Sequence, residues 1–390
     1  MSVEASPNPN LTPVPCVEIN SLLARADALV IDMRSPAEFE QDHLSGALNV
    51  PLFDDAQRAL VGFLYKQRSP EQAFAEGIEI VQQQIEPVLT RVAELAGWAA
   101  PEGSLEQHVT AMTADGIEAM ERKLQGALTG SLPARPVILH CLRGGLRSRS
   151  VVALLRRLGY DDCFALQGGY QEYRRHIRQG LEDWEAPPAF ALRGLTGVGK
   201  TLVLRELEQI RPRWTVDLEG LAGHRSSLLG MVGLKPCSQK TFESRIAARI
   251  EVGFDNRVVY EGESRRVGKA EIPVRMWESL QTAQNIELVA PPERRVQVLC
   301  DDYLADPSAR PLLREQIVAV EKRMQTGGRL ARLFDEAREP ELTQVLLDEY
   351  YDPLYRHSET GREYGVSIDS TDPGEAALQI AQWIEGAADR

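Results

Sequence analysis

The segment best suited to covalent chemistry holds one cysteine followed by glycines and arginines. Residues 141–148 read Cys-Leu-Arg-Gly-Gly-Leu-Arg-Ser, between an apolar run and a helical pattern. Backbone N–H groups in such a loop, at a helix N-terminus, favour a bound anion and the thiolate form of the cysteine. Arg143 and Arg147 add positive charge. The pattern predicts that Cys141 is reactive and that Arg143 and Arg147 assist it, although most lone cysteines after a strand serve packing alone.

Two chemistries use loops of this kind. The spacing from His140 through Cys141 and Arg147 to Ser148 matches the protein tyrosine phosphatase pattern. Residues 32–34, 43–51 and 166–170 instead resemble a rhodanese domain, in which the cysteine carries sulfur or selenium as a persulfide or its selenium analogue. The loop is longer than is usual in rhodaneses, so the loop alone leaves phosphatase chemistry open. The flanking motifs favour chalcogen transfer.

A second segment is suited to phosphate binding. Residues 194–201 match the complete pattern G-x-x-x-x-G-K-[ST] between an expected strand and an expected helix. In such a P-loop, backbone N–H groups surround phosphates, lysine neutralises them and the final hydroxyl can hold Mg²⁺. The predicted phosphate-binding residues are Gly194, Thr196, Gly197, Val198, Gly199, Lys200 and Thr201. The pattern identifies no base; ATP is the default ligand, and another diphosphate fits equally.

Acidic residues follow two expected strands near the P-loop. Glu261 and Glu263 form one candidate pair of supporting acids, and Asp217 and Glu219 form another. A solvated carboxylate at a strand end explains each pair as well. The segment after the second pair holds His224 and Arg225, which could close over a phosphate, and Arg265 is a further candidate anion contact. The sequence predicts no metal-ligand set, although Thr201 is compatible with Mg²⁺.

Composition limits the remaining possibilities. The chain has 390 residues, 43% hydrophobic and 26% charged, which predicts a globular protein of two or three domains. No apolar run of about 18 residues occurs, so no membrane span is expected. The net charge of −13 leaves room for a local basic groove. Five scattered cysteines without C-x-x-C argue against disulfides or zinc and favour a cytoplasmic setting. Cys16 is assigned to a frayed N-terminal tail.

Strands and helices alternate along the chain, which predicts an α/β fold with parallel sheets. We expect a rhodanese-like domain at 15–180, with a helical insertion at about 70–133, and a P-loop NTPase-like α/β domain at 189–385 with a helical C-terminal part. The segment 180–188, which ends in Trp-Glu-Ala-Pro-Pro, is the expected linker. Both chemical loops follow strands, where parallel sheets bind ligands.

Taken together, these features resemble the bacterial tRNA 2-selenouridine synthase family, in which a rhodanese-like half precedes a P-loop half. The resemblance covers about residues 31–355. Besides the two loops, the matching stretches are 65–67, 168–170, 216–227, 263–265 and 349–355. The helical stretch 70–133 is longer than expected for the family, either as a structural elaboration or as extra RNA-contacting surface.

The resemblance implies a substrate and roles for both loops. It implies that the wobble 2-thiouridine of tRNAs for Lys, Glu and Gln is first S-geranylated from geranyl diphosphate. The geranylated sulfur is then replaced by selenium from selenophosphate. By this resemblance Cys141 handles selenium and residues 194–201 hold the diphosphate. No tightly bound cofactor is implied, and the enzyme that produces selenophosphate is a candidate partner.

RNA contacts would have to come from local features. Candidate residues are Lys322, Arg323 and Arg329 in a basic helical cluster with Arg332, and Tyr350 and Tyr351 with Tyr355 for stacking on an unpaired base. An ordinary solvated helix face and a packed aromatic cluster explain them equally well. Three other functions remain open at this level: a rhodanese sulfur carrier fused to an ATP-dependent kinase or ATPase, a cysteine phosphatase, and a non-enzymatic RNA-binding adaptor.

Overall fold

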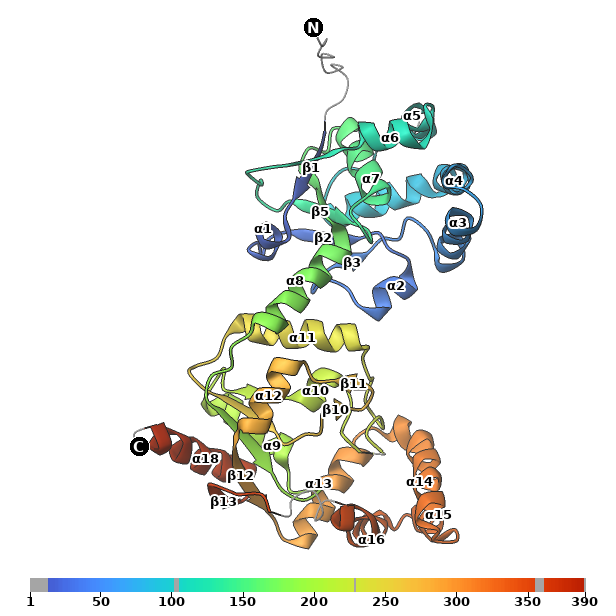
Figure 1. The fold of residues 1–390 in the computed structure, drawn as a ribbon. Coiled ribbons are helices and arrows are strands. Elements are labelled where there is room, and N and C mark those ends of the chain that lie inside the picture. The colour runs from blue at the N-terminus through green and yellow to red at the C-terminus, as the bar shows by residue number, and fades with distance from the viewer. Residues whose placement is uncertain (1–12, 102–104, 228, 355–360, 389–390) are drawn as a thin grey trace. The chain divides into compact units, whose positions relative to one another are not determined.

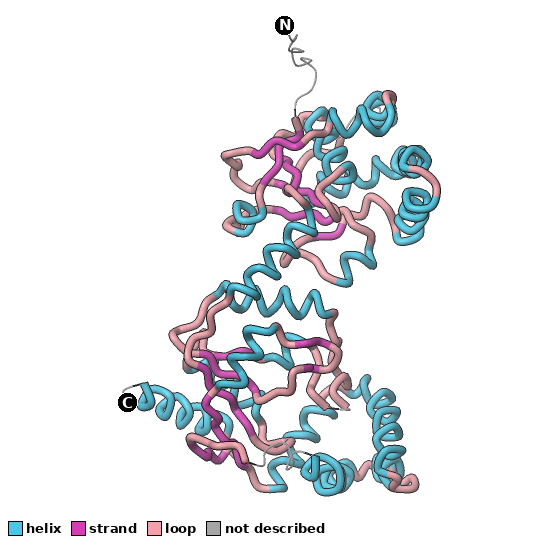
Figure 2. The backbone as a smooth tube through the Cα atoms, in the orientation of Figure 1, coloured by secondary structure: helices cyan, strands magenta, loops and turns pink. Residues whose placement is uncertain are grey.

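The computed structural model describes residues 13–101, 105–227, 229–354 and 361–388. The chain divides into two compact units, Met1–Arg178 and Gln179–Arg390. Each unit is built on its own sheet with helices against it, as Figures 1 and 2 show. Within the described ranges, no helix is long and apolar enough to cross a membrane. The α/β class with parallel sheets, predicted from the sequence, is confirmed.

The first unit is built on a parallel sheet. Its described strands have the order β3-β2-β5-β6-β1-β4. Their bounds are β1 Val14–Val17, β2 Leu29–Asp32, β3 Leu48–Asn49, β4 Gly126–Leu128, β5 Val137–His140 and β6 Cys163–Leu166. Cys16 is fully buried in β1, between β6 and β4. Its assignment to a frayed tail was wrong, because the apolar pattern of β1 is too short to stand out beside the prolines.

The helices of the first unit include the predicted insertion. Their bounds are α1 Ile19–Leu23, α2 Pro36–Gln41, α3 Asp55–Gln67, α4 Pro70–Ala96, α5 Leu105–Thr113, α6 Gly116–Lys123, α7 Leu146–Arg157 and α8 Gly169–Asp183. The side chain of Ser69 caps α4, and Gly97 ends it with a φ of 71°. The insertion is not wholly helical, since β4 adds an edge strand beside β1.

The second unit is built on another parallel sheet, with described strands in the order β13-β12-β7-β9-β8. The bounds are β7 Ala189–Arg193, β8 Thr215–Val216, β9 Val258–Glu261, β12 Gln284–Val289 and β13 Val366–Asp369, and a small antiparallel pair consists of β10 Arg266–Val267 and β11 Ala270–Glu271. The central strand β7 leads directly into the P-loop. The predicted strand, loop and helix are therefore present.

The helices of the second unit include the predicted helical C-terminal part. They are α9 Lys200–Ile210, α10 Leu218–Ala222, α11 Gln239–Val252, α12 Val274–Thr282, α13 Pro292–Leu304, η1 Pro307–Ala309, α14 Arg310–Met324, α15 Arg329–Asp335, α16 Glu339–Leu346, η2 Leu347–Tyr351 and α18 Pro373–Ala388. Helix α8 continues to Asp183, so the first part of the expected linker 180–188 is helical and only its proline-containing end is irregular.

Candidate functional site

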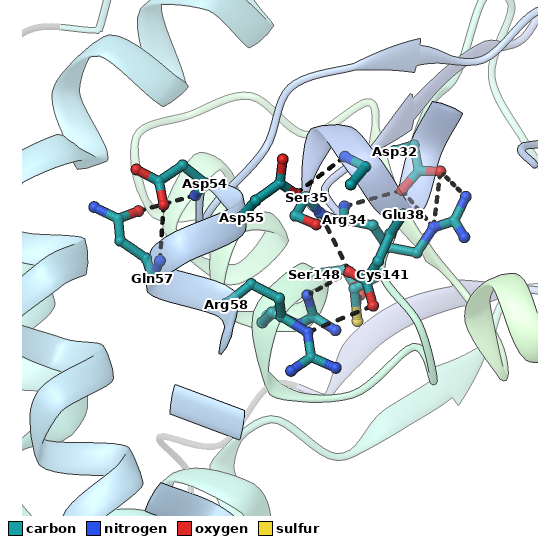
Figure 3. Close-up of polar contacts among 12 residues, drawn as sticks. Asp32, Arg34, Ser35, Glu38, Asp54, Asp55, Gln57, Arg58, Cys141 and Ser148 are labelled. Atoms are coloured by element: carbon teal, nitrogen blue, oxygen red, sulfur yellow. Dashed lines mark hydrogen bonds and ion pairs between the residues drawn. The ribbon is translucent and has the colours of Figure 1, made fainter. Parts of the chain in front are cut away.

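The cysteine loop lies at the carboxyl end of β5, a central strand of the first sheet. Cys141 follows β5 directly and is only 3% exposed. Ser148, in the first turns of α7, donates a hydrogen bond from Oγ to Cys141 Sγ at 3.3 Å, and Figure 3 shows the two side chains together. A hydroxyl donor and a helix N-terminus both stabilise negative charge on the sulfur. The reactivity of Cys141 and the binding of an anion by this loop stay predictions.

Two glycine pairs fix the shape of this loop. Gly144 and Gly169 both have positive φ, 59° and 60°. A Cβ on Gly169 would lie 2.3 Å from Cys141 O and from Gly144 N, so no other residue fits there. The backbone of α8 closes the contact, because Tyr170 N donates to Cys141 O at 2.9 Å. The family stretch 168–170 therefore acts by bracing the cysteine loop.

A buried polar cluster lies beneath the loop. Arg34 and Asp32 form a buried ion pair with Nη2 and Oδ2 2.6 Å apart, and the Arg34 guanidinium lies 3.6 Å from the centre of the Tyr170 ring. His140 is fully buried, 3.7 Å from Asp32, and burial lowers its pKa. These groups join β2, β5 and the start of α8. The motif at 32–34 thus serves to position the loop.

The arginines near Cys141 differ in their surroundings. Arg143 is exposed. Arg147 lies 3.6 Å from Glu38, and the same carboxylate lies 3.4 Å from Arg58 of α3. Figure 3 includes the side chains of Glu38 and Arg58 that form this ion pair. The sequence analysis missed Arg58 because nothing in its local pattern links it to a loop 83 positions later.

The P-loop connects β7 to α9. Gly194, Gly197 and Gly199 have φ values of 137°, 84° and 82°, conformations that residues with a Cβ rarely adopt. Lys200 Nζ donates to Gly194 O at 3.2 Å, so the ammonium lies back across the loop. Thr196 Oγ1 is buried, with no hydrogen-bond partner among the described residues. The backbone shape and the lysine together form a cradle for phosphate.

Three carboxylates meet beside the P-loop. One oxygen each of Glu219, Glu261 and Glu263 lies within 4.8 Å of the others. Thr201 Oγ1 donates to Glu261 Oε2 at 2.7 Å, whereas Glu261 Oε1 is buried without a hydrogen-bond partner in the part of the chain described. Burial, followed by the charge of Glu219, raises the pKa of Glu263 to about 7 and that of Glu261 well above its usual range.

These carboxylates have the chemistry of a divalent-cation site. Hard oxygen donors are the ligands that Mg²⁺ prefers, and a cation would offset the repulsion between buried acids. The sequence marked all three as candidate supporting acids but did not predict that they meet in one cation site, because they come from two separate segments. Only the folding of the end of β9, the turn after it and the start of α10 against one another brings them together.

Two of the four other predicted anion contacts, Asp217 and Arg225, have ion-pair partners within the protein. Asp217 caps α10, accepting from Gly220 N at 2.6 Å, and pairs with Arg205. Arg225 is paired with Asp302 and donates to Val232 O at 2.7 Å. His224 is half-buried, and burial lowers its pKa. Arg265 is exposed. Contact of these four side chains with an anion stays a prediction.

Comparison with known proteins identifies the family. Residues 187–330 match the family model described as the tRNA 2-selenouridine synthase AAA domain, and residues 106–176 match the rhodanese-like domain. The tRNA 2-selenouridine synthase of Chromohalobacter salexigens is 30% identical over 363 residues, covering 86% of this chain and 89% of that protein. The chain belongs to the tRNA 2-selenouridine synthase family. The resemblance inferred from the sequence motifs is confirmed.

Two further relatives match over nearly the same span. The tRNA 2-selenouridine synthase of Hydrogenovibrio crunogenus is 28% identical, covering 84% of this chain and 88% of the relative. That of Cupriavidus pinatubonensis is 29% identical, covering 85% and 89%. Both units of the chain therefore have counterparts in other members of the family.

One buried ion pair connects the P-loop of this family member to the motif at 349–355. Arg295 donates from Nη1 to Asp352 Oδ2 at 3.0 Å and from Nε to Thr196 O at 2.8 Å. Both partners of the pair are buried. A Cβ on Gly197 would come within 2.8 Å of Arg295 O. Arg295 was not predicted as a site residue, because it follows Glu293 and Arg294 in α13 and its local sequence carries no sign of burial.

The RNA-binding candidates differ in accessibility. Lys322, Arg323 and Arg329 are exposed on α14 and α15, and Arg329 pairs with Glu349 at 2.9 Å. Tyr351 is 6% exposed and meets Tyr350 edge-on, with ring centres 5.2 Å apart. This burial fits the packed aromatic cluster better than a stacking platform. Tyr355 lies outside the described residues. RNA contact by the remaining candidates stays a prediction.

Proposed function

We propose that this chain is a tRNA 2-selenouridine synthase that modifies the wobble 2-thiouridine of tRNAs for Lys, Glu and Gln. Family membership supports the enzyme class. The observation that carries the two-step chemistry is the presence in one chain of a thiol within an anion-binding loop and of a P-loop beside buried carboxylates. Such an enzyme would work on tRNA in the cytoplasm. The enzyme that makes selenophosphate is a candidate partner.

In the first step, residues 194–201 hold the diphosphate of geranyl diphosphate. The bond between the geranyl carbon and the diphosphate oxygen breaks, and the 2-thio sulfur of the uridine forms a bond to that carbon. Diphosphate leaves with the electron pair, and the uridine gives up its N3 proton, which the released diphosphate takes up. Lys200 and the loop N–H groups stabilise the charge that develops on it. The supporting observation is a glycine-shaped loop with its lysine drawn across it.

In the second step, the loop containing Cys141 handles selenium. The selenium of selenophosphate forms a bond to C2 of the uridine, the C2–S bond breaks, and geranylthiol leaves and takes up a proton. Water then cleaves the P–Se bond and releases phosphate. No oxidant or reductant is needed. The loop N–H groups and Arg147 favour the anionic donor, and Ser148 favours negative charge at Cys141.

We also propose that Glu219, Glu261 and Glu263 can hold Mg²⁺ beside Thr201. The buried oxygen of Glu261 without a partner and the raised pKa of Glu263 support this assignment. The cation would neutralise a bound diphosphate. In this view the domain at 15–180 carries selenium chemistry, and the domain at 189–385 carries geranylation.

A nucleoside assay tests the proposal. The protein is incubated with 2-thiouridine tRNA, geranyl diphosphate and selenophosphate, and the digested RNA is analysed by mass spectrometry. We expect S-geranyl-2-thiouridine and 2-selenouridine. Cys141→Ala should stop at the geranylated nucleoside, and Lys200→Ala should yield neither product. Absence of both nucleosides with the unmodified protein would refute the proposal, and turnover of ATP without geranyl dependence would favour the kinase or ATPase alternative.

A further inference from the structure

An apolar cavity lies beside the cysteine loop, within the first unit. Its volume is about 210 Å³, and its wall is formed by α3, α4, α5, α6 and α7. Figure 1 shows these helices gathered on the same side of the sheet. The cavity is larger than the ~150 Å³ apolar cavities known to bind a molecule such as benzene. It therefore has room for a hydrocarbon group.

The lining of the cavity is hydrophobic, which decides the kind of ligand. Residues on its wall include Phe53, Phe74, Val81, Met112, Met120 and Leu154. Over most of this wall an anion or a nucleobase would lose its hydration without gaining hydrogen bonds, because the polar lining is limited to Tyr65, Thr113, Glu121, Arg147 and Ser150. An aliphatic chain makes no hydrogen bonds to water that it could lose, and removing its apolar surface from water is favourable. The wall therefore favours an aliphatic chain.

Helix α7 connects this cavity to the reactive thiol. Ser148 of α7 donates to Cys141 Sγ, and its neighbours Leu146, Arg147 and Ser150 line the cavity. The helical stretch at 70–133, which exceeds the length expected from the family resemblance, supplies most of the opposite wall. At the far side, Tyr65 of α3 lines the cavity and is 57% exposed, so the cavity borders solvent there. A chain seated inside would thus have one end against Leu146 and Arg147 of the cysteine loop.

We propose that this cavity holds the geranyl chain of S-geranyl-2-thiouridine while the sulfur at C2 is replaced near Cys141. The helical insertion would then serve as an isoprenyl-binding wall, and geranylthiol would leave from the same cavity after the C2–S bond breaks. This inference rests on the proposed function, since it takes the geranylated uridine as the group brought to Cys141. Such a cavity would favour the geranylated tRNA over unmodified 2-thiouridine at this site.

Gly77 provides a way to fill the cavity. It lies in the middle of α4 and lines the cavity, and a Cβ there would meet only Phe53 Cζ, at an ordinary contact distance of 3.7 Å. Gly77→Leu should therefore occupy the space without straining the backbone. Gly77→Ala is the matched control, because it adds the Cβ but leaves most of the volume free.

The test is a calorimetric titration of the full chain with S-geranyl-2-thiouridine nucleoside, compared with S-methyl-2-thiouridine. We expect the unmodified protein and Gly77→Ala to bind the geranyl compound with a negative heat-capacity change. Gly77→Leu should bind it at least ten-fold more weakly and should lose the preference over the methyl compound. Circular dichroism confirms that each variant is folded. Equal binding by a folded Gly77→Leu, or no binding by the unmodified protein, overturns the inference.

A gain-of-function variant covers the case in which Gly77→Leu does not fold. Phe74→Ala enlarges the same wall and should increase binding of S-farnesyl-2-thiouridine several-fold relative to the geranyl compound; no increase counts against the cavity. Selenation of geranylated tRNA is measured in parallel. If the unmodified protein makes no 2-selenouridine, the proposed function fails, while the titrations still decide whether the cavity binds an isoprenyl chain.

Discussion

At the scale of single residues, the environment of each reactive group decides what it can do. Cys141 receives a hydrogen bond from Ser148 and lies in the loop between β5 and α7. Glu263 is buried beside two other carboxylates, which disfavours its charged form. The first arrangement stabilises a negative charge and the second opposes one. Each of these two arrangements can be tested by substituting one side chain.

We expect Ser148→Ala to reduce the reactivity of Cys141. The variant removes the only donor to Sγ recorded among the described residues, and hydrogen bonds to charged groups contribute about 1.5–3 kcal/mol. Alkylation of Cys141 by iodoacetamide, followed by peptide mass spectrometry, should slow by roughly ten-fold. Ser150→Ala on the same helix is the control, because Ser150 Oγ bonds only Arg147 O in the described structure. An unchanged rate would show that the hydroxyl does not stabilise the thiolate.

Glu263 predicts a pH dependence of stability. Its folded-state pKa of about 7 exceeds the ordinary value of 4.5, so the folded protein keeps a proton that the unfolded chain releases. This stabilisation is complete below about pH 4.5 and is lost as the pH rises through 7. In buffer with EDTA, the free energy of unfolding should fall on the order of 1–3 kcal/mol between pH 5 and 8 from this group.

Glu263→Gln should flatten that fall, because the amide stays neutral throughout. Urea unfolding at pH 5 and pH 8 gives the comparison. Mg²⁺ should restore stability at pH 8 in the unmodified protein and less in the variant, since a cation binds only the ionised carboxylates. Identical pH profiles for the two proteins would contradict the raised pKa.

At the scale of elements, close backbone contacts align the loops. The turn before α8 packs against the cysteine loop at a distance that admits no side chain at Gly169. In the second unit, the Arg295 and Asp352 pair ties α13 to the segment after η2 and to the P-loop. Both contacts join segments remote in sequence. The loops are therefore held from outside as well as by their own turns.

Gly169→Ala tests the contact at the cysteine loop. The added Cβ would lie 2.3 Å from two backbone atoms at a φ of 60°, so either the loop or α8 must shift. Such strain costs about 1–3 kcal/mol, and the thermal midpoint should fall by several degrees. Gly130→Ala is the control, because a Cβ there meets no described atom within 4 Å. Equal midpoints for both variants would show that the contact can relax.

At the scale of the whole molecule, the two chemical sites belong to different compact units. The cysteine loop and its apolar cavity are formed within the first unit, and the P-loop and carboxylates within the second. Under the proposed function, the geranylated tRNA produced at the second unit is the substrate of the first. A variant that lacks Cys141 and a variant that lacks Lys200 should then fail at different steps.

Mixing Cys141→Ala with Lys200→Ala should restore 2-selenouridine. The first variant would release geranylated tRNA, and the second would convert it, because each retains one intact site. The product is measured by nucleoside mass spectrometry after the two proteins share one tRNA pool. The double variant Cys141→Ala/Lys200→Ala is the negative control. Failure of the mixture, with each single step intact, would mean that the intermediate is not exchanged between molecules.

The sequence by itself determined the two loops, their strand-to-helix context and the family. These signals are local: the glycine, lysine and cysteine positions follow from what a bound phosphate or a thiolate needs within eight consecutive residues. The α/β class also follows from local alternation of strands and helices. Short strands such as β1 were not predicted, because four residues show too little periodicity to indicate a strand.

Only the tertiary structure decided what surrounds the loops. Arg58, the gathering of Glu219 with Glu261 and Glu263, and the pair of Arg295 with Asp352 all join distant segments. The apolar cavity likewise needs five helices to close. Such groupings depend on how the elements pack, and pattern within one segment does not specify that packing. The burial that raises the pKa of Glu263 has the same origin.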